Sequence, residues 1–290
     1  MTFNDNARSS GPRASRRGRG TGIAIGGGGL GVLALVLISQ LVGVDLTGLA
    51  GLMGGGSSMG SGPLTPVENC ETGADANANT ECRVSFVAES LDAYWEGELG
   101  AAYTPPPFML FEQSVTTACG NATSAVGPFY CPPDQTVYLD ISFYDELRNK
   151  FGAEGGPLAQ MYVVAHEFGH HIQNIQGTMD RAKRGDTGPT SDSVKIELQA
   201  DCYAGAWAGA AATTPDQNGT PFLKPITQQE MSDALNAASV IGDDRIQETM
   251  SGQVHPESWT HGSSAQRQKW FHTGYENGAA HCDTFAAAKL

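Results

Sequence analysis

The chain has 290 residues, 40% of them hydrophobic, and its 31 acidic against 17 basic residues give a formal net charge of −14 at pH 7. This length allows one or two domains with a sizeable core. The acidic balance argues against nucleic acid and anionic lipid headgroups as partners of the folded part, because both are negatively charged. The charge suits neutral or basic polypeptides better.

The first 66 residues differ from the rest in composition. Residues 1–21 are basic and rich in Ser and Gly, which predicts a disordered tail. Residues 22–44 carry no charge. As a helix this segment would reach about 34 Å, which is enough to cross a hydrocarbon layer of about 30 Å. The apolar run is longer than the roughly 7–15 residues of a signal peptide, so an uncleaved transmembrane anchor is favoured over a cleaved signal.

The predicted anchor sets an expected topology. The arginines of the tail place the N-terminus in the cytoplasm by the positive-inside rule. A Gly- and Ser-rich tether is expected at 45–66, and one domain at 67–290. The predicted localisation is therefore the cell membrane, with a single pass through the lipid bilayer and an extracytoplasmic domain. The oligomeric state is not predicted.

Periodicity and punctuation residues predict the elements of the domain. A helix is expected at 89–100 and strands at 108–115 and 136–141. Further helices are expected from Pro157 to a stop at Gly177, after caps at 191–193, after a capping box of Thr227 and Glu230, and from Ser263 or Ser264 to Gly278. The C-terminal half is therefore expected to be mostly helical.

The most informative motif lies in the helix that begins at Pro157. His166, Glu167 and His170 form an H-E-x-x-H pattern. Two histidines four residues apart leave the same face of a helix and can meet one zinc ion. Glu167 then lies beside the metal without ligating it, which suits a base that removes a proton from water. The alternative is a helix whose histidines merely satisfy hydrogen bonds in the core.

Hydrolytic zinc sites use three protein ligands and keep one position open, so a third ligand is required. Glu197 and Asp201 are again four residues apart, in a second predicted helix. We assign Glu197 as the third ligand and Asp201 as the carboxylate that accepts the second ring N–H of a ligating histidine. The alternative is a solvated acidic face in an acidic chain.

The order H-E-x-x-H followed by E-x-x-x-D resembles the glutamate-zincins, a large group of metallopeptidases. Further stretches make the chain similar to the bacterial neutral zinc metallopeptidase family. These stretches are Cys119-Gly120, 126–132, 137–140, 166–171, 199–202 and Thr260-His261-Gly262-Ser263. The resemblance implies His166, His170 and Glu197 as ligands of one catalytic Zn²⁺, Glu167 as base, and Asp201 as support for a histidine.

The resemblance and the predicted elements together give the expected fold class. It is an α+β, zincin-like fold, mostly helical, with a small mixed sheet beside the H-E-x-x-H helix and one N-terminal transmembrane helix. In zincins an edge strand just before the active-site helix can accept an extended substrate. We expect 136–141 to be that strand, and the alternative is an ordinary inner member of the sheet.

The six cysteines lie beyond the predicted anchor. Six cysteines allow 15 pairings, so spacing gives only a preference. Pairs close in sequence favour Cys70 with Cys82 and Cys119 with Cys131, which leaves Cys202 with Cys282. A zinc-thiolate site is the rival interpretation, but no C-x-x-C spacing supports it.

His261 lies just before the last predicted helix, where a loop could bring it across from the zinc. It could donate to a developing oxyanion, as a histidine or tyrosine commonly does in glutamate-zincins. A structural or surface histidine is the alternative. His171 lies off the metal-facing side of its helix and is given no catalytic role.

These observations predict a zinc metalloendopeptidase that hydrolyses peptide bonds with zinc-activated water and Glu167 as general base. Two alternatives stay open. One is a zinc-containing surface module that binds without cutting. The other is a zinc hydrolase of a non-peptide amide, such as a cell-wall component.

Overall fold

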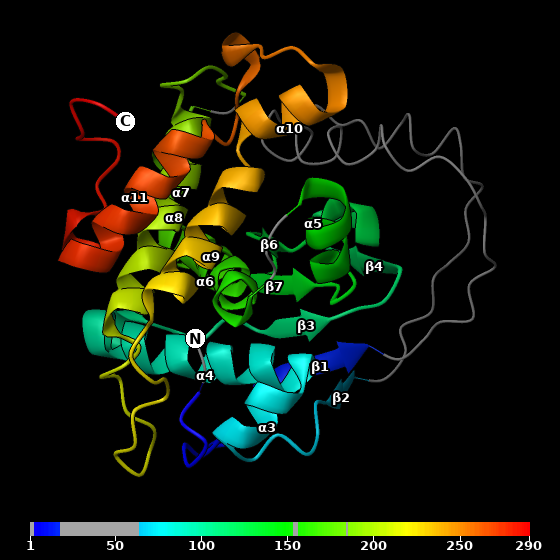
Figure 1. Ribbon diagram of the computed structural model, residues 1–290, viewed down its shortest axis with the longest axis vertical. Helices are drawn as coiled ribbons and strands as arrows, with labels where there is room; N and C mark the ends of the chain where they lie inside the picture. Colours follow the sequence, from blue (N-terminus) through cyan, green and yellow to red (C-terminus); the bar gives the residue numbers. More distant parts are fainter. Residues whose placement is uncertain (1–2, 18–63, 153–155, 184) are drawn as a thin grey trace.

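The computed structural model describes residues 3–17, 64–152, 156–183 and 185–290. Figure 1 shows the long helices of the C-terminal half gathered on one side and the strands on the other. The strands are β1 (Ala14–Arg17), β2 (Leu64–Pro66), β3 (Phe108–Leu110), β4 (Ser114–Thr117), β5 (Gly120–Thr123), β6 (Phe129–Cys131) and β7 (Thr136–Leu139). The structure therefore agrees with the predicted α+β class and its mixed sheet.

The described helices carry most of the core. They are α3 (Gly73–Ala78), α4 (Thr80–Leu99), α5 (Phe143–Phe151), α6 (Pro157–Ile175), α7 (Thr178–Arg181), α8 (Asp192–Ala210), α9 (Gln228–Val240), α10 (Asp243–Ser251) and α11 (Ser264–Asn277), with short 3-10 helices at Gly100–Ala102, Ser124–Val126, Pro256–Ser258 and Ala279–His281. Several predicted helix signals are confirmed. Pro157 opens α6, Ser191 caps α8, and capping boxes start α9 at Thr227 and α11 at Ser263.

The main sheet has the strand order β2-β1-β3-β7-β6. Strand β3 runs parallel to both β1 and β7, while β2 and β6 pair antiparallel at the two ends. The predicted strand 108–115 is split, because the chain turns at Gln113 with φ 66° before β4 pairs with β5 in a separate hairpin. The predicted edge strand is also wrong: β7 lies inside the sheet, and among the described strands β6 forms the edge beside α6.

Within the tail predicted to be disordered, 1–21, the structure describes residues 3–17, and these are folded. Residues 3–17 pack on the domain, and β1 takes a place within the main sheet. Phe3 is fully buried and meets the ring of Phe86 edge-on at 5.2 Å. Arg13 pairs with Asp92 of α4 and donates to the carbonyl oxygen of Pro106 at 3.0 Å. Composition suggested solvation of these arginines, but α4 offers them carboxylates.

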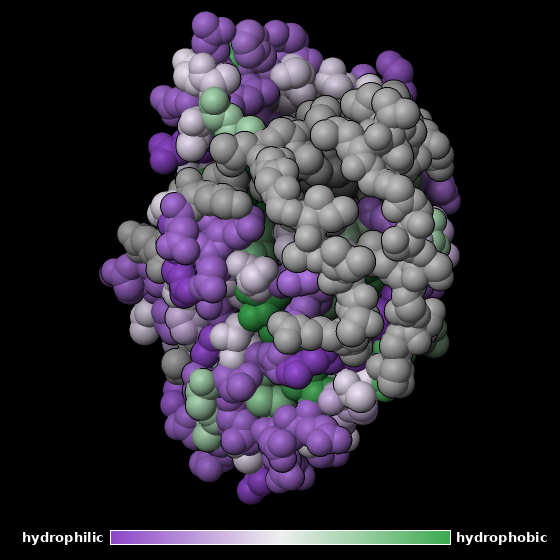
Figure 2. Space-filling view, turned by 90° about the vertical axis from the view of Figure 1, so that its right-hand side faces the viewer, coloured by the Kyte–Doolittle hydropathy of each residue, from purple (hydrophilic) through white to green (hydrophobic). Residues whose placement is uncertain are grey.

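The predicted transmembrane helix and localisation need correction. Among the described residues, no helix has the length and apolar character needed to cross a membrane. The predicted span, 22–44, lies outside the described residues. A single pass there would separate residues 3–17 from the domain, whereas β1 pairs with both β2 and β3 on one sheet. The face of the molecule in Figure 2 is mainly hydrophilic where the structure describes it, in keeping with the net charge.

Glycines let α8 and α11 approach closely. A Cβ added to Gly205 would lie 1.9 Å from the carbonyl oxygen of Phe271, and one added to Gly274 would lie 1.8 Å from that of Cys202. Only glycine allows backbones to come so near. The close contact fixes α11 against the part of α8 that carries the site.

Three disulfides join Cys70 to Cys82, Cys119 to Cys131 and Cys202 to Cys282. This is the pairing that the spacing favoured. The third disulfide ties α8 to the C-terminal segment at the residue that follows Asp201.

Candidate metal site

Helix α6 carries the H-E-x-x-H motif with one face in the core. Met161, Ala165, Phe168 and Ile172 are at most 1% exposed. Their spacing of four and three residues places them on one side of the helix. His166 and His170 therefore point from another side of α6, toward α8. The motif is held on a rigid, buried helix.

Helix α8 brings Glu197 to these histidines. His166 Nε2 lies 3.2 Å from Glu197 Oε2, and His170 Nε2 lies 3.5 Å from Glu197 Oε1. One ligand atom from each of the three residues lies within 4.8 Å of the others. Glu197 is 5% exposed, so the group is enclosed by protein.

The donor set fits zinc. Two atoms that each lie about 2.0–2.1 Å from a tetrahedral zinc are separated by about 3.3–3.4 Å. The two nitrogen–oxygen separations between the histidines and Glu197 fall on either side of that value. Two imidazoles and one carboxylate are also the ligand types of hydrolytic zinc sites with an open position.

Both histidines are oriented through their Nδ1 atoms. His166 Nδ1 lies 2.8 Å from Asp201 Oδ1, and His170 Nδ1 lies 2.9 Å from Gln173 Oε1. A carboxylate oxygen and an amide oxygen only accept, so Nδ1 carries the proton in both rings. In the neutral form of each ring, Nε2 then keeps a lone pair directed at the space that the histidines share with Glu197. Gln173 is itself held, because its amide nitrogen, Nε2, donates to the carbonyl oxygen of Ile196 at 2.7 Å.

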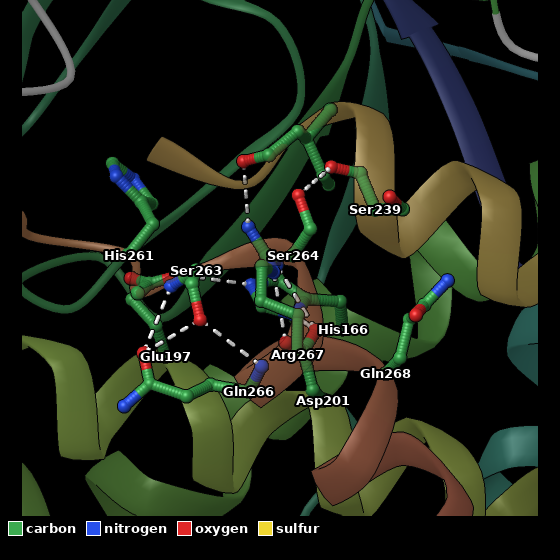
Figure 3. Close-up of polar contacts among 12 residues, drawn as sticks. His166, Glu197, Asp201, Ser239, His261, Ser263, Ser264, Gln266, Arg267 and Gln268 are labelled. Atoms are coloured by element: carbon green, nitrogen blue, oxygen red, sulfur yellow. Dashed lines mark hydrogen bonds and ion pairs between the residues drawn. The ribbon is translucent and has the colours of Figure 1, made fainter. Parts of the chain in front are cut away.

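Arg267 is part of the site, although it is not among the site residues predicted from the sequence. Its Nε donates to Asp201 Oδ2 at 2.8 Å and its Nη2 to Asp201 Oδ1 at 2.9 Å (Figure 3). Tyr162, one helical turn before His166, donates its hydroxyl to Asp201 as well. Arg267 lies within the apolar stripe of α11, next to Trp270 and Phe271. A charged residue there was the available signal, but nothing in the sequence named its partner.

Charge and burial oppose each other in this group. Burial would raise the pKa of Asp201, but Arg267 and His166 outweigh it and hold the pKa below its ordinary value. Burial would likewise raise the pKa of Glu197, and the neighbouring His170 and His261 reverse the effect. Both carboxylates are therefore ionised, as a metal ligand and the partner of a ligating imidazole need to be.

Glu167 has a different environment from Glu197. It is 8% exposed, and burial raises the pKa of its carboxyl, with partial compensation by His170 and His166. The carboxylate also accepts the backbone N–H of Tyr130 in the edge strand β6. A carboxyl with a raised pKa, next to the candidate ligands, is suited to taking up and releasing a proton.

His261 comes close to the site from the loop before α11. Glu197 contributes to raising the pKa of His261, against the lowering effect of burial, so the two side chains interact electrostatically. The loop is fixed by Asp243, whose Oδ2 accepts the backbone N–H groups of Thr260, His261 and Gly262 at 2.8, 2.7 and 3.0 Å. His261 Nδ1 lies 2.9 Å from the hydroxyl of Thr260.

Fold and site together define an α+β protein in which an H-E-x-x-H helix and a following helix bring two histidines and a glutamate to one candidate metal position. The chain belongs to the family described as "Putative neutral zinc metallopeptidase", whose model matches residues 2–285. The match includes residues 3–17, which the structure packs on the domain. It confirms the resemblance inferred from the motifs, and the family name implies zinc and a polypeptide substrate.

Relatives are found in distant bacteria. The chain is 48% identical over 254 residues to "Uncharacterized protein Rv2575" of Mycobacterium tuberculosis (strain ATCC 25618 / H37Rv), covering 87% of this chain and 86% of the relative. It is 37% identical over 260 residues to "Uncharacterized protein YpfJ" of Escherichia coli (strain K12), covering 88% and 85%. No solved structure matches the chain.

Proposed function

We propose that the protein is a zinc metallopeptidase that hydrolyses peptide bonds with Glu167 as general base. The observation that carries the proposal is the convergence of His166, His170 and Glu197, with the Glu167 carboxylate beside them in a buried position. A metal that only stabilises the fold does not need a carboxyl with a raised pKa, such as that of Glu167, next to its ligands. Family membership supports the same class of reaction.

His166, His170 and Glu197 would hold the ion, and each of the two histidines has a hydrogen-bond partner that orients its ring. When bound, zinc would polarise the scissile carbonyl and lower the pKa of water in the open position. Asp201 and Gln173 keep the two imidazoles in the tautomer that leaves Nε2 free. Arg267 in turn keeps Asp201 ionised and in place.

Glu167 handles the proton in this mechanism. Its carboxylate accepts a proton from the attacking water, and the carboxylic acid then donates that proton to the leaving amine. The raised pKa favours the first step, because a carboxylate with a higher pKa is a stronger base. His261 is proposed to donate to the oxyanion that develops on the carbonyl oxygen.

The polypeptide is proposed to bind along β6. This strand ends the sheet in the described part of the chain, so one side of its backbone has no strand partner there. An extended peptide can add to such an edge through main-chain hydrogen bonds. Tyr130 connects this edge to Glu167, so a peptide bound there would have its backbone next to the base.

The test uses the full-length protein loaded with zinc and unfolded casein as the substrate. Hydrolysis should stop with 1,10-phenanthroline and return when zinc is added back. Glu167→Gln should keep stoichiometric zinc and lose hydrolysis, while Glu96→Gln on exposed α4 surface should behave as the parent. Hydrolysis that survives complete removal of metal would rule out the mechanism. A zinc-loaded parent that cuts no polypeptide would favour the binding module or the non-peptide amide hydrolase.

A further inference from the structure

His171 follows the second histidine of the motif but faces another part of the molecule. It is 1% exposed, and both ring nitrogens have partners. Nε2 lies 2.7 Å from the carbonyl oxygen of Thr104, and Nδ1 lies 3.1 Å from the hydroxyl oxygen of Tyr130. A carbonyl only accepts, so Nε2 carries the proton and Nδ1 accepts from the Tyr130 hydroxyl.

The phenol of Tyr130 is fixed from a second direction. Asn174 Nδ2 donates to the same hydroxyl oxygen at 2.8 Å. The hydroxyl therefore donates to His171 and accepts from Asn174, and both residues belong to α6. The Tyr130 and His171 rings also meet edge-on, with centroids 5.5 Å apart. Helix α6 thus determines where this side chain lies.

The backbone of Tyr130 also contacts α6, because its N–H donates to the carboxylate of Glu167. Strand β6 spans three residues and pairs with β7 on one side, so the ladder alone fixes it weakly on the side of α6. Tyr130 links α6 to the base through both its side chain and its backbone. A shift of the phenol would move the N–H that fixes the carboxylate of Glu167.

We propose that His171 is a positioning residue for Glu167 and acts through Tyr130. His171 and Asn174 hold the phenol, the phenol holds the backbone of β6, and the N–H of Tyr130 orients the carboxylate. The inference rests on the proposed function, since it gives Glu167 the role of base. It also assigns His171 a role distinct from that of the adjacent ligand His170.

The variants separate hydrogen bonding from bulk. Tyr130→Phe keeps the ring and removes the hydroxyl, and His171→Leu removes both ring nitrogens. His171→Gln keeps one donor and one acceptor on a side chain of similar length. Ser90→Ala is the matched control, because it removes a buried hydrogen bond of 3.1 Å, to Trp207 Nε1, that has no link to Glu167.

For the zinc-loaded protein, Tyr130→Phe and His171→Leu should each lower kcat by about tenfold with little change in KM, as expected for a lost hydrogen bond that orients a catalytic group. The double variant should be no slower than either single one, because both break one connection. His171→Gln should recover most of the loss. Zinc content should stay the same in all variants, and Ser90→Ala should keep the parental kcat.

A measurement independent of activity accompanies the kinetics. Amide hydrogen exchange at Tyr130 should be slow in the parent and faster in Tyr130→Phe and His171→Leu, but unchanged in Ser90→Ala. Additive losses in the double variant, or unchanged exchange at Tyr130, would overturn the proposal. If the parent hydrolyses no polypeptide, the proposed function fails, while the exchange rates still decide whether His171 fixes the backbone next to Glu167.

Discussion

Arg267 donates hydrogen bonds to both carboxylate oxygens of Asp201, with Nε 2.8 Å from Oδ2 and Nη2 2.9 Å from Oδ1. Both residues are at most 2% exposed. Asp201 also meets His166 at 2.8 Å, so one carboxylate connects the arginine of α11 to a candidate zinc ligand of α6. Such a bidentate pair fixes the direction of the carboxylate as well as its charge. The metal position therefore depends on a helix that supplies no ligand.

Arg267→Met should leave the Asp201 carboxylate buried without its main partner. Breaking a buried pair in this way typically lowers the free energy of unfolding by about 3–5 kcal/mol. Loss of the support behind a ligating histidine should also weaken zinc binding by roughly 10–100-fold. Urea unfolding and competition with a zinc chelator measure the two effects. Arg245→Met, on the exposed surface of α10, is the control and should change neither quantity.

Gly205→Ala should disturb the packing of α8 on α11. The added Cβ would lie 1.9 Å from the carbonyl oxygen of Phe271, so a backbone must move. Overpacking of this kind typically destabilises by about 1–3 kcal/mol. Gly97→Ala in α4 is the contrasting change, because its Cβ would meet nothing within 4 Å, and it should stabilise the helix by about 0.5–1 kcal/mol. Equal unfolding midpoints for the two variants would contradict this account.

Asp243→Asn should loosen the loop that carries His261 in a pH-dependent way. The pKa of Asp243 is lowered in the folded protein, where His261 and the backbone N–H groups of the loop outweigh burial. The unfolded chain then binds the proton more readily, so acid favours unfolding. The stabilisation is complete above the ordinary pKa of 3.8 and is lost as the pH falls below it.

At pH 7 the Asp243→Asn variant should be less stable than the parent by about 1–3 kcal/mol, as expected for lost hydrogen bonds to a charged group. The difference should shrink when unfolding is measured well below pH 3.8. Asp180→Asn, at an exposed position of α7, provides the control for loss of one acidic charge. A difference that stayed constant over this pH range would refute the assigned cause.

Phe3→Ala should destabilise the whole domain, although Phe3 lies in a segment whose composition suggests disorder. The ring is fully buried against Phe86, and truncation of a buried phenylalanine typically reduces the free energy of unfolding by about 3–5 kcal/mol. Asn6→Ala, at an exposed position three residues further, should change stability by less than about 0.5 kcal/mol. Thermal unfolding of both variants is the measurement, and similar melting temperatures would show that the segment does not belong to the core.

The candidate ligands could be predicted because fixed helical offsets place them. His166 and His170 share one helical face whatever the rest of the fold does, and Glu197 follows from the need for a third ligand. Arg267 could not be found in this way, since its contact with Asp201 depends on how α11 packs on α8. Gln173 lies three residues after His170 on α6, so the hydrogen bond between them is local. The bond that fixes the Gln173 amide goes to Ile196 of α8 and depends on tertiary packing.

The errors in the predicted fold have physical causes. The arginines near the N-terminus predicted a solvated tail. In the structure Arg13 forms an ion pair with Asp92 on α4, and the backbone of β1 pairs with β3 in the sheet. Strand β7 was expected at the edge because zincins have an edge strand just before the active-site helix. The position of a strand in a sheet depends on which strands it pairs with. Strand β6 has only three residues, which is too short for its alternation to be recognised in the sequence.

The placement of β1 has a consequence for how the polypeptide reaches its final form. Ala14 pairs with Phe108, and β3 in turn pairs with β7. During synthesis β1 leaves the ribosome well before β3 and must wait without this partner until β3 has emerged. Contacts between such distant parts of a chain form slowly. The closing of the sheet around β1 is thus expected to be a late event on the folding pathway.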